Sequence, residues 1–395
     1  MKFLRLFLRV RFCGPRKART AILYENDYWI RAMVLRDIPA TTFAIYPDVS
    51  AVFHFTPAIL VSALRRMGKI RLGGNRAGSI FWQVYAQYLL ACLDDIGADV
   101  VLTFIDNSNF FQQITLLDSN RTYYAIQNGA RTLFCVRDSL PLPPHPASVI
   151  SMTHFFCFGK RDVELFQKHG HRINVYHPVG SLIGGYYKSV VSKPVAVCQY
   201  DLCLISQWHE HFFPENGSEE IGNMLGNRTA VGILGLNSFV ARLVAETGLK
   251  LVICPRNDCS VPEMSFYRRM FGERVAIARP DRRNFSTYKT VEQSRLTIAL
   301  NSTTLAEVFS WGQKVLWCNV PGDELFEMQV AGSAYFQGDD YSAFKQQALE
   351  LLELDPAKFV ARTRENAHYI NHFDSARPAH EVIRTKVMDV LNRCS

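Results

Sequence analysis

Short apolar runs alternate with amphipathic stretches along most of this chain, from residue 20 to residue 319. Runs such as Val100 to Ile105 and Leu249 to Cys254 have the length and composition of buried strands. Stretches such as Ser79 to Ile96 repeat apolar residues at the spacing of an amphipathic helix. Because strands that alternate with helices form parallel sheets covered on both faces, the sequence predicts an α/β fold.

The chain has 395 residues, which is long enough for two such domains. We expect an N-terminal arm (1–19), a first Rossmann-like domain (20–190), a second Rossmann-like domain (191–340) and C-terminal helices (341–395). Ligands of a doubly wound sheet collect beyond the carboxyl ends of its strands. The predicted fold class is therefore two doubly wound Rossmann-like domains facing a cleft, with a helical C-terminal tail.

Composition narrows the class of protein. Hydrophobic residues make up 48% of the chain and the formal net charge is +8, which suits a globular protein with anionic ligands such as nucleotides or phosphorylated lipids. The charge does not indicate nucleic acid, and we expect no nucleic acid partner. The ten cysteines are scattered without a CxxC pair, so we expect no metal site and a reducing, cytoplasmic environment.

The first twenty residues, MKFLRLFLRVRFCGPRKART, are basic and contain no acidic residue. As a helix they would place Lys2, Arg5 and Arg9 along one side and apolar residues along another, a pattern that suits an anionic membrane surface. A solvated basic arm is the alternative. The arm predicts peripheral association with the inner face of the plasma membrane.

Polar residues follow several predicted strands of the first domain, where a carboxylate can accept the proton of an attacking hydroxyl. The candidate catalytic residues are Asp106, which is the first choice, and Glu25, which is a weaker one. The candidate residues for binding an acceptor are Asn107, Gln127, Asn128 and Gly129. A helix cap is the alternative role for Asp106.

The stretch Leu296 to Asn319 reads as a strand, a helix and a second strand. Asn301, Ser302, Thr303 and Thr304 form the turn before the helix, and Glu307 follows about one turn later. A helix N-terminus carries unpaired N–H groups and partial positive charge, so this hydroxyl-rich turn can hold a phosphate. A simple helix cap is the alternative.

Other candidates for binding a phosphate-bearing compound lie in both halves of the chain. Gly180 and Ser181 follow a strand and permit a tight turn or close approach to a ligand. Arg256, followed by Asn257, comes directly after a strand, where its guanidinium fork can bind a diphosphate. Arg282 lies in a basic loop, RPDRRN. An exposed surface arginine is the alternative for Arg256.

The ordered combination of several segments resembles the surface-carbohydrate biosynthesis transferases of bacteria, GT-B-like proteins encoded among lipopolysaccharide and capsule genes. The segments are IDNSNFF (105–111), YAIQNGAR (124–131), HFFCFGKRDVELFQKHG (154–170), VGSLIGGYY (179–187), DLCLISQ (201–207) and LNSTTLAEVFSWGQKVLWCN (300–319). The resemblance implies that Asp106 and the IQNG segment line the acceptor side. It also implies that Gly180, Ser181 and the Ser302 to Thr304 turn with Glu307 face the activated donor.

We therefore expect a glycosyltransferase that moves a sugar from a nucleotide-activated donor to a growing surface polysaccharide or lipopolysaccharide, a glycan or glycolipid acceptor. The donor is a substrate, so no separate cofactor is expected. Its phosphates should lie against the helix near Thr303, assisted by Arg256 or Arg282, with Asp106 as the base. A phosphotransferase of the polyol-phosphate type and a non-catalytic binding module of a polysaccharide assembly complex are the alternatives.

Overall fold

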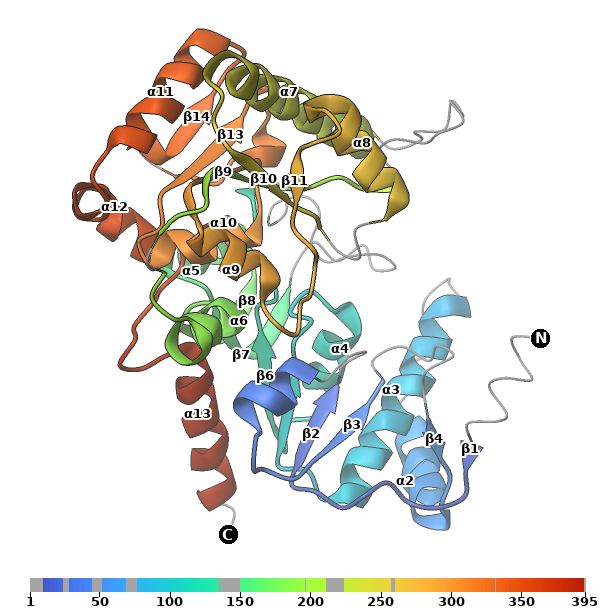
Figure 1. The fold of residues 1–395 in the computed structure, drawn as a ribbon. Coiled ribbons are helices and arrows are strands. Elements are labelled where there is room, and N and C mark those ends of the chain that lie inside the picture. The colour runs from blue at the N-terminus through green and yellow to red at the C-terminus, as the bar shows by residue number, and fades with distance from the viewer. Residues whose placement is uncertain are drawn as a thin grey trace.

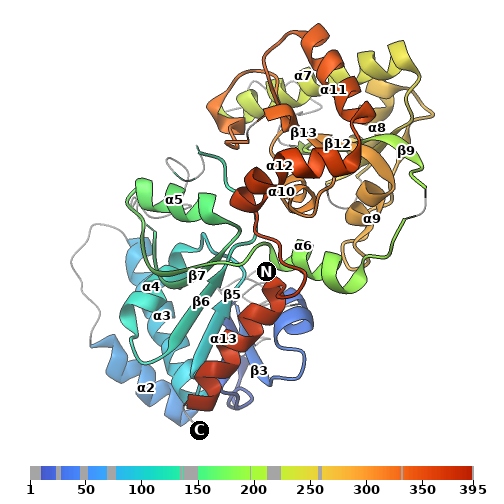
Figure 2. The ribbon, with the colours of Figure 1, turned by 90° about the vertical axis from the view of Figure 1, so that its left-hand side faces the viewer.

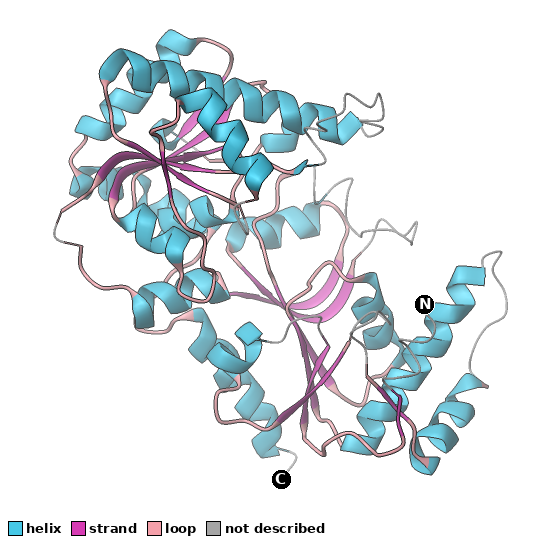
Figure 3. Ribbon diagram, turned by 45° about the vertical axis from the view of Figure 1, so that its right-hand side comes forward, coloured by secondary structure: helices cyan, strands magenta, loops and turns pink. Residues whose placement is uncertain are grey.

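The computed structural model describes residues 10–23, 28–44, 52–68, 77–133, 136, 150–195, 197–210, 224–256, 260–330 and 332–393. These residues form two lobes, each built around a six-stranded sheet in which all described strand pairs are parallel. Figure 3 shows each sheet flanked by helices. The prediction of an α/β fold with two doubly wound, Rossmann-like units is confirmed.

The first lobe is built on a sheet with the strand order β3-β2-β5-β6-β7-β8. Its strands are β2 (Thr20–Leu23), β3 (Ala40–Phe43), β5 (Val100–Thr103), β6 (Thr122–Ile126), β7 (Ser151–Cys157) and β8 (Arg172–Pro178). Its helices are η1 (Ile30–Val34), α2 (Pro57–Met67), α3 (Ala77–Ile96), α4 (Asn109–Leu117), α5 (Lys160–Lys168), α6 (Leu182–Tyr186) and η3 (Tyr187–Val191). A separate pair of short parallel strands, β1 (Val10–Arg11) and β4 (Phe53–His54), lies beside α2 and α3 (Figure 1).

The second lobe is built on a sheet with the strand order β11-β10-β9-β12-β13-β14. Its strands are β9 (Tyr200–Ile205), β10 (Leu251–Cys254), β11 (Ala276–Ile277), β12 (Ser294–Ala299), β13 (Val315–Asn319) and β14 (Tyr335–Gln337). Its helices are α7 (Met224–Thr247), α8 (Val261–Phe271), α9 (Ser286–Glu292), α10 (Thr303–Ser310), η5 (Glu324–Phe326), η6 (Gly332–Ala334), α11 (Tyr341–Glu353) and α12 (Pro356–Ile370). Central strands such as β13 are buried throughout because helices cover both faces of the sheet.

The last helix, α13 (Ala379–Arg393), returns to the first lobe and lies along it (Figure 2). Arg384 donates to the backbone oxygen of Val34 at 3.2 Å, and Arg19 donates to the backbone oxygen of Leu391 at 2.7 Å. The chain therefore passes between the lobes twice, once after β8 and once before α13.

Aromatic side chains join the lobes where the chain crosses. The ring of Tyr187 stacks on Tyr288 with centroids 5.0 Å apart, and Trp29 contacts Phe285 at 5.6 Å. All four side chains are buried and belong to one apolar cluster that extends from the first lobe into the second. This shared core fixes the lobes beside each other and defines the space between them.

Several local predictions differ from the structure. The expected boundary between the two domains, at residues 190 and 191, lies within η3 rather than between two elements. Helix α9 and strand β14 were not predicted. The first described residues of the N-terminal arm form strand β1 rather than a helix, and residues 1–9 lie outside the described part of the chain.

Within α7, the segment Arg228–Thr247 is long and apolar enough to cross a membrane by length and composition, with a mean hydropathy of 1.3 in its best window. Its side chains Ile233, Leu236, Val240 and Leu243 are buried in the core of the second lobe. Val231 and Leu234 of the same helix are exposed, so α7 packs one face against the second lobe and leaves the other at the surface.

Candidate active site

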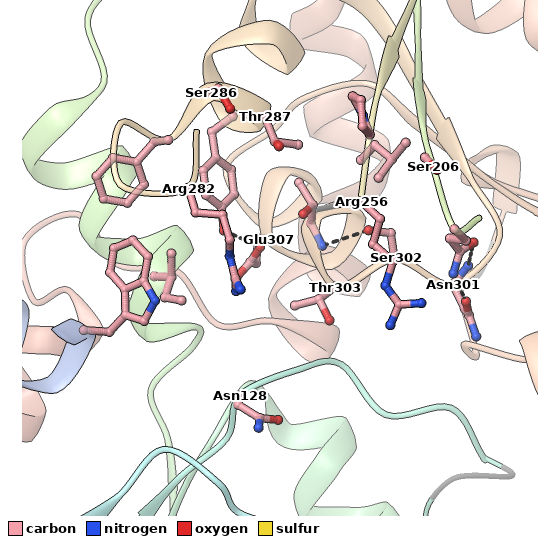
Figure 4. Close-up of a pocket in the computed structure, with 18 of the residues that line it drawn as sticks. Asn128, Ser206, Arg256, Arg282, Ser286, Thr287, Asn301, Ser302, Thr303 and Glu307 are labelled. Carbon is pink, nitrogen blue, oxygen red and sulfur yellow. Dashed lines mark hydrogen bonds between the residues drawn. The ribbon is translucent and has the colours of Figure 1, made fainter. Parts of the chain in front are cut away.

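A cavity of about 620 Å³ lies between the two lobes, at the carboxyl ends of strands β9, β10 and β12. Most of its lining comes from the second lobe, while Trp29, Asn128 and Ile183 come from the first. Figure 4 shows Asn128 on the first-lobe side of the cavity. The predicted site residues that line it are Asn128, Arg256, Arg282, Asn301, Ser302, Thr303, Thr304 and Glu307. The structure thus gathers in one cavity residues that the sequence places at separate strand ends.

Helix α10 begins at this cavity. Ser302 is its N-cap, and the Ser302 hydroxyl accepts a hydrogen bond from the backbone N–H of Thr304 at 3.2 Å. The backbone N–H of Leu305 donates to the backbone oxygen of Ser302 at 3.1 Å, whereas the first residue of a helix, here Thr303, has no N–H partner within the helix. Thr303 and Thr304 both line the cavity. An anion in the cavity can therefore lie against the partially positive end of α10.

Two side chains brace the loops that carry the site. Gln207, after β9, accepts a hydrogen bond from the backbone N–H of Asn301 at 3.1 Å, which ties the loop after β12 to β9. Glu263 on α8 is 4% exposed and accepts from the Ser206 hydroxyl at 2.5 Å and from the backbone N–H of Arg256 at 3.1 Å. The ends of three neighbouring strands are thus held in one arrangement before any ligand binds.

Two arginine side chains supply positive charge to the cavity. Figure 4 shows Arg256 and Arg282 on its second-lobe side, directed toward the space above Asn128. Both arginines are exposed, and neither forms an ion pair with a carboxylate in the described part of the chain. Guanidinium groups bind phosphate oxygens through paired hydrogen bonds, so the two arginines and the start of α10 suit a diphosphate.

Glu307 is the acidic residue in the cavity lining, and it is 3% exposed. Its carboxylate accepts hydrogen bonds from the Ser181 hydroxyl at 2.5 Å and the Tyr288 hydroxyl at 2.7 Å. Burial raises the pKa of Glu307 to about 7, although these hydrogen bonds and the charge of Arg282 act in the opposite direction. A Cβ atom at Gly184 would lie 2.9 Å from the Glu307 side chain, so only glycine leaves room for it.

The loop after β6 brings the first lobe into contact with the start of α10. The backbone N–H of Ala130 donates to the Thr303 hydroxyl at 3.0 Å, and a Cβ atom at Gly129 would lie 3.1 Å from that same oxygen. Asn128, one residue earlier, is exposed in the cavity. The first lobe therefore reaches the predicted phosphate position through this loop.

The prediction that Asp106 faces the cleft is wrong. Its side chain is fully buried, and Arg131 binds both carboxylate oxygens at 2.7 and 2.8 Å. The backbone N–H of Asn128 also donates to Asp106 at 3.1 Å. Asp106 therefore holds the loop that carries Asn128 and does not line the cavity.

Gly180 and Ser181 also lie outside the cavity lining. Gly180 is buried with φ 89°, and a Cβ atom there would lie 1.8 Å from the backbone oxygen of His372. This glycine is therefore required for the packing of the segment before α13. Ser181 caps α6 and contacts the cavity only through its hydrogen bond to Glu307.

The other predicted residues that the structure describes do not line the cavity. Gln127 is 1% exposed and donates to the backbone oxygen of Gly129 at 2.9 Å, so it shapes the loop from inside. Asn107 is half-buried in the turn after β5, away from the lining. Glu25 and Asn257 lie outside the described residues.

Much of the apolar and hydroxyl lining was not predicted from the sequence. These residues are Trp29, Ile183, Ile205, Ser206, Gln207, Thr229, Pro255, Phe285, Ser286, Thr287 and Tyr288. Those directly after β9 and β10 could have been found with the strand-end argument that identified Arg256. The aromatic residues carry no such pattern, because their sequence context is typical of core positions.

Solved structures of known proteins share this two-lobed arrangement. S. aureus MnaA, in a structure with UDP, matches with a TM-score of 0.56 at 14% identity over 95% of this chain and 97% of that one. The UDP-GlcNAc 2-epimerase from Neisseria meningitidis bound to UDP-GlcNAc gives 0.51 at 12% identity over 94% and 99%. A glycosyltransferase from Rickettsia africae gives 0.50 at 9% identity over 95% and 98%. The chain has the GT-B fold.

No protein-family model matches the sequence, and no curated protein matches it significantly.

Within the described residues of this GT-B chain, no group of three histidine, cysteine, aspartate or glutamate side chains is placed to hold a metal ion.

Asp106→Asn is expected to lower the free energy of unfolding by about 3 kcal/mol, because it removes one charge of a buried ion pair. Urea unfolding measures this effect. Asp37→Asn is a matched control: Asp37 is 76% exposed and lies 3.5 Å from Arg384, so its loss should cost less than about 1 kcal/mol. An Asp106→Asn variant that is as stable as the wild type but inactive would instead support a catalytic role.

Proposed function

We propose that this GT-B chain is a glycosyltransferase that uses a nucleotide-activated sugar and extends a surface polysaccharide or lipopolysaccharide. One observation carries the proposal: Arg256, Arg282 and the start of α10 at Thr303 converge on a single cavity between the lobes. Two cations and a helix N-terminus favour a diphosphate, the group common to nucleotide sugars.

The proposed arrangement also suits the chemistry of transfer. When an acceptor hydroxyl attacks the anomeric carbon, its proton can pass to a phosphate oxygen of the donor as the glycosidic bond forms. The bond between the anomeric carbon and the diphosphate breaks, and negative charge develops on the leaving oxygen. Arg256, Arg282 and the partially positive end of α10 would stabilise that charge where it appears. The donor is the only activated compound that the reaction needs, so the proposal includes no metal and no further cofactor.

The acceptor would enter from the side of the first lobe. Asn128 is exposed in the cavity, and its amide can hydrogen-bond to sugar hydroxyls. The loop that carries Asn128 contacts Thr303 through Ala130, so acceptor and donor positions are adjacent. We propose that this enzyme acts in the cytoplasm, where nucleotide sugars are substrates for glycans assembled at the inner face of the membrane.

Two other reactions fit the same cavity. Solved structures with this fold include 2-epimerases of UDP-GlcNAc, whose substrate also carries a nucleoside diphosphate. A phosphotransferase of the polyol-phosphate type would form a phosphodiester instead of a glycosidic bond. The products distinguish the three: a glycosylated acceptor, an epimerised nucleotide sugar released without acceptor, or a new phosphodiester.

A nucleotide-sugar panel tests the proposal. At a concentration of about one hundred times Kd, a ligand that binds only the native state adds about 2.7 kcal/mol to stability, which should raise Tm by a few degrees. The binding nucleotide sugar is then incubated with membrane glycolipids, and glycosylated product is measured by mass spectrometry. The proposed transfer would be contradicted if no nucleotide sugar raised the Tm of the protein. It would also be contradicted if the protein only converted the nucleotide sugar to its epimer.

A further inference from the structure

The apolar side of helix α2 faces away from the protein. Leu60, Val61 and Leu64 are 44%, 46% and 66% exposed, and their spacing places them on one face of the helix. Singly exposed apolar residues are common on protein surfaces, but three on one helical face form a continuous stripe. The solvent-facing side of α2 therefore has the composition expected of a buried side.

The polar side of α2 faces inward and fixes the rotation of the helix. Ser62 donates to Asp94 on α3 at 3.0 Å, and Arg66 pairs with the same carboxylate at 2.7 Å. Ile59 and Ala63, on that side, are buried in the core of the first lobe. Turning the leucines inward would break these contacts, so the outward stripe is a stable feature of the fold.

The basic N-terminal arm joins the protein beside this stripe. Strand β1 pairs with β4, and the backbone N–H of Phe55 donates to the oxygen of Arg11 at 2.8 Å, just before the Thr56 cap of α2. Phe12 is 87% exposed at the same place. The preceding residues, MKFLRLFLR, contain basic and apolar residues and no acidic ones. Strand β1, with which the described part of the arm begins, and α2 thus lie together at one end of the first lobe (Figure 1).

Charge around the stripe is positive. Arg11 and Arg65 are exposed, whereas the nearby carboxylate of Asp94 is bound by Arg66 and Arg121, and that of Asp95 by Lys17. An apolar stripe bordered by cations matches the boundary between anionic headgroups and acyl chains. This charge favours a lipid surface over a second copy of the chain, which would bring like charges together.

We propose that the stripe of Leu60, Val61 and Leu64, with Phe12, inserts into an anionic membrane surface while Arg11 and Arg65 beside it bind the headgroups. The stripe adds apolar anchoring to the electrostatic attraction of these arginines, and stable membrane association generally requires two such contributions. The inference does not rest on the proposed reaction, because it uses a surface separate from the cavity lining.

Sedimentation with phosphatidylcholine vesicles, with and without phosphatidylglycerol, tests the inference on the full chain. The wild type should bind only the anionic vesicles, and less tightly as salt is raised. Leu60→Ser with Leu64→Ser should raise the lipid concentration needed for half-maximal binding by about tenfold. The matched control is Leu116→Ser with Leu117→Ser, on α4, where the side chains are 72% and 49% exposed; it should bind as the wild type does.

Several results would overturn the proposal. Unchanged binding by the Leu60 and Leu64 variant, with a wild-type Tm, would show that α2 does not contact lipid. Analytical ultracentrifugation measures the oligomeric state of both proteins. A dimeric wild type and a monomeric variant would show that the stripe binds a second copy of the chain instead of lipid.

Discussion

Replacing Arg256 and Arg282 together with alanine is expected to weaken the binding of a nucleoside diphosphate by about 100-fold or more. Both guanidinium groups line the cavity beside the start of α10, and neither pairs with a carboxylate of the described residues. Their hydrogen bonds to phosphate would therefore be gained on binding rather than exchanged for internal ones. Calorimetric titration of UDP, CDP and GDP into both proteins measures the change.

Arg279→Ala is the matched control for the charge effect. Arg279 is exposed in the same basic loop as Arg282 but does not line the cavity. The control should retain wild-type affinity, and all variants should keep the wild-type Tm without ligand because the replaced side chains are exposed. Equal losses of affinity in the control and the double variant would mean that only the general positive field attracts the ligand.

The second large effect concerns Glu307 and pH. Burial raises the pKa of Glu307 from 4.5 to about 7, so the native state holds this proton more tightly than the unfolded chain does. The resulting stabilisation is fully present below pH 4.5 and is lost as pH rises through 7. Glu307→Gln stays neutral, so its stability relative to the wild type should increase between pH 5 and pH 8, by about 3 kcal/mol at most.

Urea unfolding at both pH values measures this change. Glu353→Gln is the control, because the Glu353 side chain is 85% exposed. Its replacement leaves the buried carboxylate of Glu307 unchanged. That control should follow the wild type at both pH values. If Glu307→Gln and the wild type differ in stability by the same amount at pH 5 and pH 8, the native carboxyl group does not bind its proton as described.

Much of this site could be predicted because short, continuous stretches of the sequence determine where its residues lie. A strand followed by hydroxyl residues and a helix identified the start of α10, and the same strand-end argument identified Arg256. Parallel sheets collect such ends at one edge, which is why Ser302, Thr303 and Arg256 meet although the sequence separates them. The alternation of strands and helices likewise predicts the fold without any homologous sequence.

The failed predictions depended on contacts between distant parts of the chain. Asp106 also follows a strand, but Arg131, beyond the next strand, binds its carboxylate and removes it from the cleft. Gly180 packs against His372, which belongs to the segment that returns from the second lobe. No local pattern distinguishes a carboxylate that faces a cavity from one that is paired beneath it.

The aromatic part of the cavity was missed for a related reason. Trp29 and Phe285 come from different lobes and meet only because the lobes share a core. Phe285 adopts a left-handed backbone conformation with φ 56°, which is uncommon for a bulky residue and is not visible in the sequence. Residues of this kind become recognisable as site residues only when both lobes are in place.

A crystal structure of the protein with a bound nucleoside diphosphate, such as UDP, tests the central claim most directly. We expect phosphate oxygens within about 3 Å of the backbone N–H group of Thr303, with the guanidinium groups of Arg256 and Arg282 on either side. A diphosphate bound elsewhere, with the start of α10 unoccupied, would contradict the assignment of this cavity to an activated donor.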